Sequence, residues 1–428
     1  MSSIIIKGGS LFGEKVADLA VGNGKIVEPS SVGSDAVVID AANCIVLPGL
    51  VDLHTHLREP GRENAETVLS GSRAGVKGGF TALSAMANTL PVADNAGVVE
   101  QVWRLGQATG LCDVFPIGAV TEGLEGKNLA EIGAMADSEA RVRVFSDDGN
   151  CVSDSLVMRR ALEYVKRFNG VIAQHAQDPR LTAGAQMNEG EVSSQLGLKG
   201  WPTIAEEAII ARDILLADHV GSRLHICHLT SAGGVELVRW AKARGIAVTA
   251  EVTPHHLLLT DELARSYDPI YKVNPPLRRA SDVQALREGL ADGTIDIIAT
   301  DHAPHPSESK ECEWQEASFG MLGLESALAI ANMVLVETGL LTWRGIAEKL
   351  SINPSAIAGY GDHGSDLSVG RAANITIIDP KREWRVDRDL MQSRSKNTPY
   401  HGMQMRGVAR DVIYRGSVVL RNGEVHNG

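Results

Sequence analysis

Eight strand-like apolar runs, each followed by a helical pattern, occupy the middle of the chain. The first six begin at residues 49, 79, 113, 141, 170 and 223, and the last two at 247 and 296. Among the helices between them we expect Ala205–Ala217 and Gly234–Arg244. Aromatic residues make up only 4% of the chain, so an aliphatic core suits a parallel sheet covered by helices. Eight such units in about 250 residues predict an α/β fold, a (β/α)8 TIM-like barrel.

The two ends of the chain have a different pattern. Residues 3–47 and 368–425 both contain short β-rich pieces separated by glycine-containing turns, which are hairpin signals. Neither end is long enough to fold alone. We therefore expect the ends to pair into one small β-sandwich. The predicted division is 1–50 and 364–428 for the sandwich and 51–363 for the catalytic barrel.

The stretch VDLHTHLREP, residues 51–60, carries His54, His56 and Arg58 at every second position. In a strand, alternate side chains share a face, so these three should point the same way and the apolar residues between them the opposite way. Polar side chains on a core strand need partners or a chemical role.

Other polar residues also follow the predicted strands. At the carboxyl ends of barrel strands, side chains converge on one mouth. The residues expected there are His54, His56, Asn88, Asp148, His175, His228, Asn274, Asp301 and His305.

Four of these histidines and two aspartates match the donor preference of divalent metals such as zinc. Six ligands are more than one tetrahedral ion can bind, whereas two metal ions that share a carboxylate would use all of them. Such a pair polarises a carbonyl and activates water near neutral pH. A single buried histidine is more often a core residue with no chemical role. Here the number of histidines and aspartates and their positions after predicted strands favour a metal site.

Several residues are assigned structural roles instead. His225 lies out of phase with His228 and should point toward the helices, and Cys227 should serve packing. Ligation by His255 or His256 is the less favoured interpretation. Four histidines are expected at the surface: His219, His363, His401 and His426.

Two acids compete in the stretch FSDDG. Asp147 and Asp148 cannot both face the mouth by strand alternation. Gly149 suggests that the strand is ending there, so alternation alone does not decide between them.

Nine short motifs follow one another along the chain, and they are specific in combination and order. They are DLHTHLREPG, MANTLPVADN, FSDDG, QHAQD, CHLTS, VTPHHLLLT, VNPPLR, ATDHAPH and FGMLGLE. With these motifs the chain resembles the class I dihydroorotases of the metal-dependent amidohydrolase superfamily. The similarity covers nearly the whole chain, including SKNTPYHGM (Ser395–Met403).

This resemblance implies the metal ligands. His54, His56 and Asp301 would bind one zinc ion, and His175 and His228 a second. Asp148 would bridge the two ions, with Asp147 as the alternative. VRVFSDDG contains no lysine that could form the carboxylated bridge found in hydantoinases, which favours a carboxylate bridge.

The resemblance also implies the reaction and its substrate contacts. N-carbamoyl-L-aspartate would close reversibly to L-dihydroorotate plus water, a step of de novo pyrimidine (UMP) biosynthesis. In hydrolysis Asp301 would act as the catalytic base and pass a proton to the leaving nitrogen. The substrate-binding positions are His56, Arg58, Asn88, Asn274, His305, Phe319 and Gly320.

Two alternative functions remain open. One is a hydantoinase or allantoinase on the same barrel; the absent lysine and the Arg58–Asn88 pair argue against it. The other is a non-catalytic partner of aspartate carbamoyltransferase, which would be expected to have lost ligands, and none is missing.

Composition limits the partners. The net charge of -12 argues against nucleic acid or an anionic membrane as the main partner. Five scattered cysteines without a C-x-x-C pair predict reduced thiols. We expect a cytoplasmic enzyme with a small-molecule substrate, a homodimer, and association with aspartate carbamoyltransferase as an open question. The polar connection Ser307–Gly320 lies where a barrel enzyme can place a mobile lid.

Overall fold

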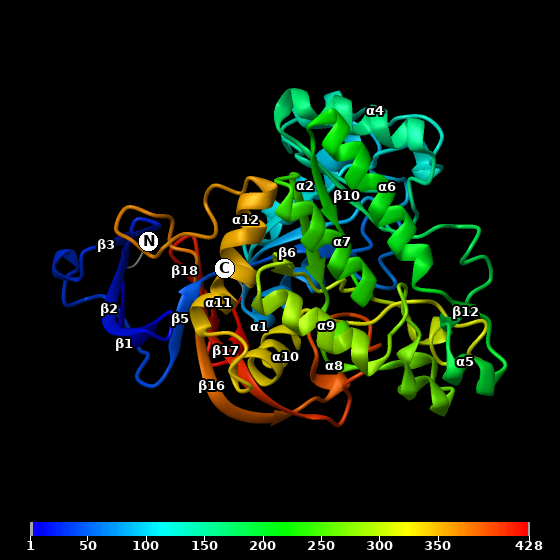
Figure 1. Ribbon diagram of the computed structural model, residues 1–428. Helices are drawn as coiled ribbons and strands as arrows, with labels where there is room; N and C mark the ends of the chain where they lie inside the picture. Colours follow the sequence, from blue (N-terminus) through cyan, green and yellow to red (C-terminus); the bar gives the residue numbers. More distant parts are fainter. Residues whose placement is uncertain (1–2, 427–428) are drawn as a thin grey trace.

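The computed structural model describes residues 3–426 and shows a mixed α/β protein (Figure 1). Eight parallel strands lie in the middle of the chain, one at each predicted run. They are β6 (Leu50–Thr55), β7 (Phe80–Ala85), β8 (Asp113–Pro116), β9 (Val144–Phe145), β10 (Val171–Gln174), β13 (Arg223–Ile226), β14 (Val248–Val252) and β15 (Ile297–Ile298).

These strands form two parallel sheets, in the orders β6-β7-β8 and β9-β10-β13-β14-β15. Single parallel bridges join the sheets at both edges. Gly118, after β8, pairs with Phe145 of β9, and Thr55 of β6 pairs with His302, after β15. Neighbours in the chain are therefore neighbours in space.

Helices separate most of these strands, and the two expected by sequence are present as α6 and α7. The helices are α1 (Val68–Gly78), α2 (Ala96–Thr109), α3 (Ile132–Asp137), α4 (Ser155–Val165), α5 (Glu191–Leu196), α6 (Ile204–Val220), α7 (Ala232–Ala243), α8 (Pro254–Leu258), α9 (Ala280–Ala291), α10 (Ala327–Ala331), α11 (Trp343–Ala347) and α12 (Asn353–Ala358). A small two-stranded sheet, β11 (Met187–Asn188) and β12 (Gly200–Trp201), lies between β10 and α6.

Local signals explain where helix α1 begins and ends. The Thr67 side chain accepts a hydrogen bond from the amide of Ser70 at its start. At its end Gly79 has φ 98°, a left-handed conformation that glycine adopts without steric cost. The chain then turns directly into β7.

Both ends of the chain contribute to one nine-stranded sheet, so the expected pairing of the ends is present (Figure 1). The junction is antiparallel pairing of β16 with β5, in which Ile375 lies opposite Pro48. The strands are β1 (Ile4–Leu11), β2 (Lys15–Gly22), β3 (Lys25–Val27), β4 (Val37–Asp40), β5 (Ile45–Pro48), β16 (Ile375–Arg385), β17 (Gln404–Tyr414), β18 (Ser417–Arg421) and β19 (Glu424–Val425).

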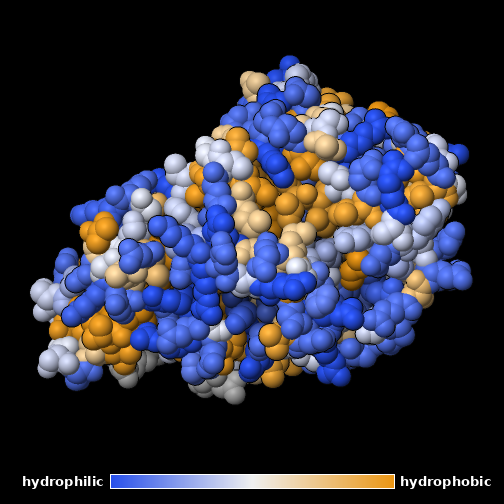
Figure 2. Space-filling view, turned by 90° about the horizontal axis from the view of Figure 1, so that it is seen from below, coloured by the Kyte–Doolittle hydropathy of each residue, from blue (hydrophilic) through white to orange (hydrophobic). Residues whose placement is uncertain are grey.

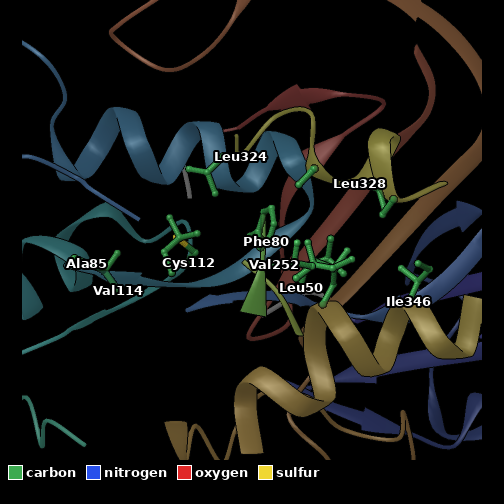
Figure 3. Packing of buried hydrophobic residues seen from close by; sticks show 14 of the residues in the cluster. Leu50, Phe80, Ala85, Cys112, Val114, Val252, Leu324, Leu328 and Ile346 are labelled. Atoms are coloured by element: carbon green, nitrogen blue, oxygen red, sulfur yellow. The ribbon is translucent and has the colours of Figure 1, made fainter. Parts of the chain in front are cut away.

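The described residues form three apolar clusters. In the largest, Leu50 and Phe80 of the parallel strands lie with Leu324, Leu328 and Ile346 (Figure 3). The second, the inner apolar cluster, takes residues from strands of both parallel sheets, so these strands share an apolar centre; it includes Val51, Ala82, Val144, Val171 and Ile297.

Figure 2 shows hydrophilic residues over much of one face, with hydrophobic residues exposed between them. None of the helices in the described part of the chain has the length and apolar content that crossing a bilayer requires.

Candidate metal centre

The structure brings all six predicted ligands into one buried cluster. His54 belongs to β6 and His56 follows it, and the others follow the ends of different strands: Asp148 after β9, His175 after β10, His228 after β13 and Asp301 after β15. Each of these six residues is at most 5% exposed. The carboxyl ends of the parallel strands therefore gather the donors, as expected.

Asp148 lies between two pairs of histidines. Its Oδ2 is 3.4 Å from His54 Nε2 and 3.3 Å from His56 Nε2. Its Oδ1 is 3.1 Å from His175 Nδ1 and 3.0 Å from His228 Nε2. One carboxylate thus presents one oxygen to each pair.

Asp301 completes the first group. Its Oδ1 lies 3.1 Å from His56 Nε2 and 3.5 Å from His54 Nε2.

Although burial opposes ionisation of Asp148, the surrounding imidazoles hold the pKa of that carboxyl well below its usual range.

Three side chains around the cluster, here called the outer partners, fix the orientation of the histidine rings by hydrogen bonding. His54 Nδ1 bonds to Glu251 Oε1 at 2.6 Å, and His56 Nδ1 bonds to Asn88 Oδ1 at 2.9 Å. His175 Nε2 bonds to Gln177 Oε1 at 2.7 Å. These oxygens accept a hydrogen bond from one ring nitrogen, so the other nitrogen of each ring faces Asp148.

The donor set fits divalent metal ions. His175 Nδ1 and His228 Nε2 lie 2.8 Å apart, and both face a carboxylate oxygen. Within residues 3–426, His54 Nε2 is buried without a hydrogen-bond partner. Imidazole nitrogens and carboxylate oxygens converge here, and these are the atoms that coordinate divalent cations such as zinc. Two such groups share Asp148: one with His54 and His56, the other with His175 and His228.

Asp147 points elsewhere. Its Oδ1 accepts hydrogen bonds from the backbone amides of Val120 at 2.8 Å and Thr121 at 2.9 Å, and its Oδ2 accepts one from the Thr121 hydroxyl. Burial raises the pKa of this carboxyl. Asp147 therefore fixes the segment after β8, and of these two adjacent acids only Asp148 faces the histidines.

The predicted substrate residues lie beside the cluster. Arg58 is 7% exposed, its Nε donates to the carbonyl of Pro304 at 3.1 Å, and one of its terminal nitrogens lies 3.4 Å from His305 Nε2. Burial lowers the pKa of Arg58 to about 10, so it stays charged at neutral pH. His305 Nε2 donates to the carbonyl of Phe319 at 2.7 Å. Burial lowers the pKa of His305 to about 3.

The two asparagines contact metal-site residues. Asn88 accepts from His56 through Oδ1, and its amide nitrogen, which has no partner within residues 3–426, can donate toward a ligand. Asn274 Nδ2 donates to Gln177 Oε1 at 3.1 Å, the same oxygen that bonds His175. Gln177 therefore connects a metal ligand with a substrate position.

Three residues of this arrangement were not predicted. Glu251 and Gln177 orient His54 and His175. Asn397, in the SKNTPYHGM segment, donates to the carbonyls of Ala303 at 2.9 Å and Gly320 at 3.2 Å. The phase of Glu251 on its strand was a usable signal; the contact of Asn397 depends on tertiary structure.

Some structural assignments were wrong. His225 does not point toward the helices: its Nε2 bonds to Glu251 Oε2 at 3.0 Å. The assignment of Cys227 to packing is confirmed, because it lies in the inner apolar cluster; its sulfur also lies near ligand-type atoms of His54 and Glu251. His363 is buried and bonds to Asp113 at 2.8 Å.

Strand β6 does not alternate regularly. Val51 and Leu53 belong to the inner apolar cluster, whereas Leu57 belongs to the larger one. The pairing of β6 with β7 shifts register between Asp52 and Thr55, and β6 ends at Thr55. This irregularity breaks the regular alternation of side chains along the strand, although His54, His56 and Arg58 do reach the same site.

The remaining histidines match their assignments. His219, His401 and His426 are exposed. His256 is held by Thr253 and the carbonyl of Pro275, and within residues 3–426 neither His255 nor His256 joins a group of ligand-type atoms.

Together, the fold and the site are those of an α/β protein with buried groups that could hold metal ions. Residues 43–233 match the family model described as Dihydro-orotase-like. The chain is 60% identical to a dihydroorotase from Streptomyces coelicolor over 99% of this chain and 100% of that relative. It is 51% identical to a dihydroorotase from Mycobacterium tuberculosis, over 99% of each chain.

A solved L-hydantoinase (dihydropyrimidinase) from Arthrobacter aurescens has a similar structure. The TM-score is 0.88 at 27% identity, over 100% of this chain and 98% of that one. A dihydropyrimidinase from Brevibacillus agri, at 21% identity and a TM-score of 0.84 over 99% and 96%, shares the fold. On its sequence relatives, this chain belongs to the dihydroorotase family.

Proposed function

We propose that this chain is a cyclic amide hydrolase that interconverts N-carbamoyl-L-aspartate and L-dihydroorotate in pyrimidine biosynthesis. The position of Asp148 between two histidine pairs carries the proposal, because it suits a two-metal hydrolytic site. Arg58, a buried cation beside that site, suits a substrate that bears a carboxylate.

Two zinc ions are the proposed cofactors. His54, His56 and Asp301 would hold one ion, His175 and His228 the other, and Asp148 both. When bound, the metal pair supplies an activated water and polarises the amide carbonyl. The imidazole and carboxylate donors and their outer partners support this assignment.

The protein's own groups bind the substrate and move the proton. Arg58 grips the carboxylate of dihydroorotate with its fork of donors, and the Asn88 amide adds another donor. In hydrolysis Asp301 accepts a proton from the attacking water and delivers it to the ring nitrogen as the C–N bond breaks. In synthesis these transfers run in reverse.

The ring is proposed to contact four further groups. His305 and Asn274 provide side chains, and the backbone of Phe319 and Gly320 provides peptide groups. His56 also borders the substrate. Support comes from the hydrogen bond that fixes His305 to Phe319 and from the contact that links Asn274 to the metal ligand His175 through Gln177.

We also propose that the eight parallel strands close into a (β/α)8 barrel, residues 51–363, with a β-sandwich from residues 1–50 and 364–428. The two bridges between the parallel sheets and the nine-stranded terminal sheet support this division. A cytoplasmic homodimer, with association with aspartate carbamoyltransferase open to test, completes the proposal.

A zinc determination combined with an activity assay on the purified chain tests the proposed function. We expect about two zinc ions per chain, as the two ligand groups imply, and turnover of dihydroorotate above that of hydantoin or allantoin. Faster turnover of hydantoin or allantoin would overturn the substrate assignment. A chain inactive on all three would point to the non-catalytic role.

The equilibrium position should depend on pH. The linear compound has two carboxylates and the ring has one, so cyclisation consumes a proton. The ratio of dihydroorotate to N-carbamoyl-L-aspartate should therefore fall about tenfold for each pH unit above the carboxyl pKa values. Chromatography of reactions started from either compound measures the ratio, and a constant ratio would contradict the proposed reaction.

Asp148→Asn and Asp147→Asn should differ in metal content. Asp148→Asn should weaken metal binding by more than the roughly 10–100-fold that loss of an outer partner costs. Asp147→Asn should instead lower the free energy of unfolding by about 1–3 kcal/mol, because it weakens hydrogen bonds to Val120 and Thr121. Zinc per chain and urea unfolding measure these effects; the reverse order of zinc contents would assign the bridge to Asp147.

A further inference from the structure

Two lysines hold the Ser307–Gly320 connection through a reciprocal set of hydrogen bonds. Lys272, in the loop after β14, donates its ammonium to the carbonyls of Trp314 at 2.7 Å and Gln315 at 3.0 Å. Lys310, within the connection, donates to the carbonyls of Lys272 at 3.0 Å and Ser318 at 2.9 Å. Each segment thus supplies a cation to the other's backbone.

Both ammonium groups are buried at a free-energy cost. Lys272 is 2% exposed and Lys310 is 4% exposed. In the part of the chain that the structure describes, neither forms an ion pair with a carboxylate; their partners are carbonyls and one aromatic ring. Burial, with Lys272 nearby, lowers the pKa of Lys310 to about 7. Apolar side chains would fill this space at lower cost, so stability alone does not account for two lysines here.

The contacts lead to the end of the connection that borders the site. The Gly320 amide donates to the carbonyl of Lys272 at 3.0 Å. The same carbonyl oxygen also accepts from the Lys310 ammonium. The Lys272 ammonium lies 4.5 Å from the centre of the Phe319 ring, within range of a cation–π interaction. Phe319 in turn accepts from His305.

One side of the connection borders free space. A cavity of about 300 Å³ is lined by His305, Lys310, Cys312 and Lys396, among others. The segment is therefore not packed solidly on that side, and its position depends on specific bonds. Loops that close over active sites commonly combine such local contacts with free volume.

We infer that Lys272 and Lys310 are positioning residues that lock the Ser307–Gly320 connection and so place Phe319 and Gly320 against the substrate ring. The inference rests on the proposed function and deepens it. Because the lysines act through this backbone and not on the metal ligands or Asp301, they govern ring binding and leave the proton transfer intact.

Lys310→Met tests this role. Methionine keeps much of the apolar stem and removes the donors, and exchanging a buried charge for an apolar group is often tolerated. We expect KM for dihydroorotate to rise roughly tenfold or more, with kcat within about threefold of the unaltered chain. Hydrogen exchange should become faster in residues 307–320, including the Gly320 amide, with zinc content unchanged.

Lys349→Met is the matched control. Lys349 is also a buried lysine that donates to a backbone carbonyl, that of Ile295 at 2.6 Å, ahead of β15 and away from the mouth. It should alter stability without changing KM or exchange in residues 307–320. Lys310→Gln retains an amide donor and should give a smaller KM increase; it decides the question if the methionine variant does not fold.

The outcomes separate the two proposals. If folded Lys310 variants show unchanged KM and unchanged hydrogen exchange in residues 307–320, the positioning role of the two lysines is wrong. A loss confined to kcat would also contradict it. If the unaltered chain does not turn over dihydroorotate, the proposed function fails, and hydrogen exchange still tests whether the lysines hold the connection.

Discussion

Replacing both His54 and His56 with alanine should leave a folded chain that has lost zinc and nearly all activity. The change removes two imidazoles that face Asp148 Oδ2, one of them held by Glu251 and the other by Asn88. The loss in kcat/KM should exceed the roughly 10–100-fold expected when only an outer partner of a metal ligand is removed.

Elemental analysis, circular dichroism and the dihydroorotate assay measure this result. His219→Ala, at an exposed position on α6, is the control and should retain both zinc and activity. A double variant that stays active with its full complement of metal would contradict the assignment of these histidines.

The Asp301→Asn variant should fail mainly in kcat, by about 100-fold or more. Asparagine can keep an oxygen near His56, but it lacks the basic carboxylate that accepts and returns the proton. Zinc content must be measured in the same sample, so that loss of metal is separated from loss of the base. Near-normal turnover would show that another group moves the proton.

Arg58→Met provides the contrast for Asp301→Asn. Arg58 is proposed to hold a carboxylate present in both substrate and transition state, so KM should rise more than kcat falls. A charge-assisted hydrogen bond contributes about 1.5–3 kcal/mol, or roughly 10- to 150-fold in kcat/KM. A loss confined to kcat would show that Arg58 has another role.

The strands and the six clustered residues could be predicted because each depends on local pattern. Every predicted run contains a strand, and parallel strands bring their carboxyl ends to the same edge. The pairing of the chain ends also followed from pattern, because short hairpins need partners.

Contacts that depend on side-chain direction were harder to predict. His225 was placed toward the helices by its offset from His228, yet His228 has a positive φ of 30° just after β13, which breaks the alternation. Asp147 and Asp148 posed the same difficulty, and only the bonds of Asp147 to Val120 and Thr121 separate them in space.

The closing contact between β5 and β16 has a consequence for synthesis of the chain. A ribosome releases β16 about 330 residues after β5, so one edge of β5 has no β16 partner while the middle of the protein emerges. Unpaired edges favour aggregation in incompletely made chains. Because the same late segment brings Asn397 to Ala303 and Gly320, a prematurely terminated chain would lack both its sheet junction and a support of its active site.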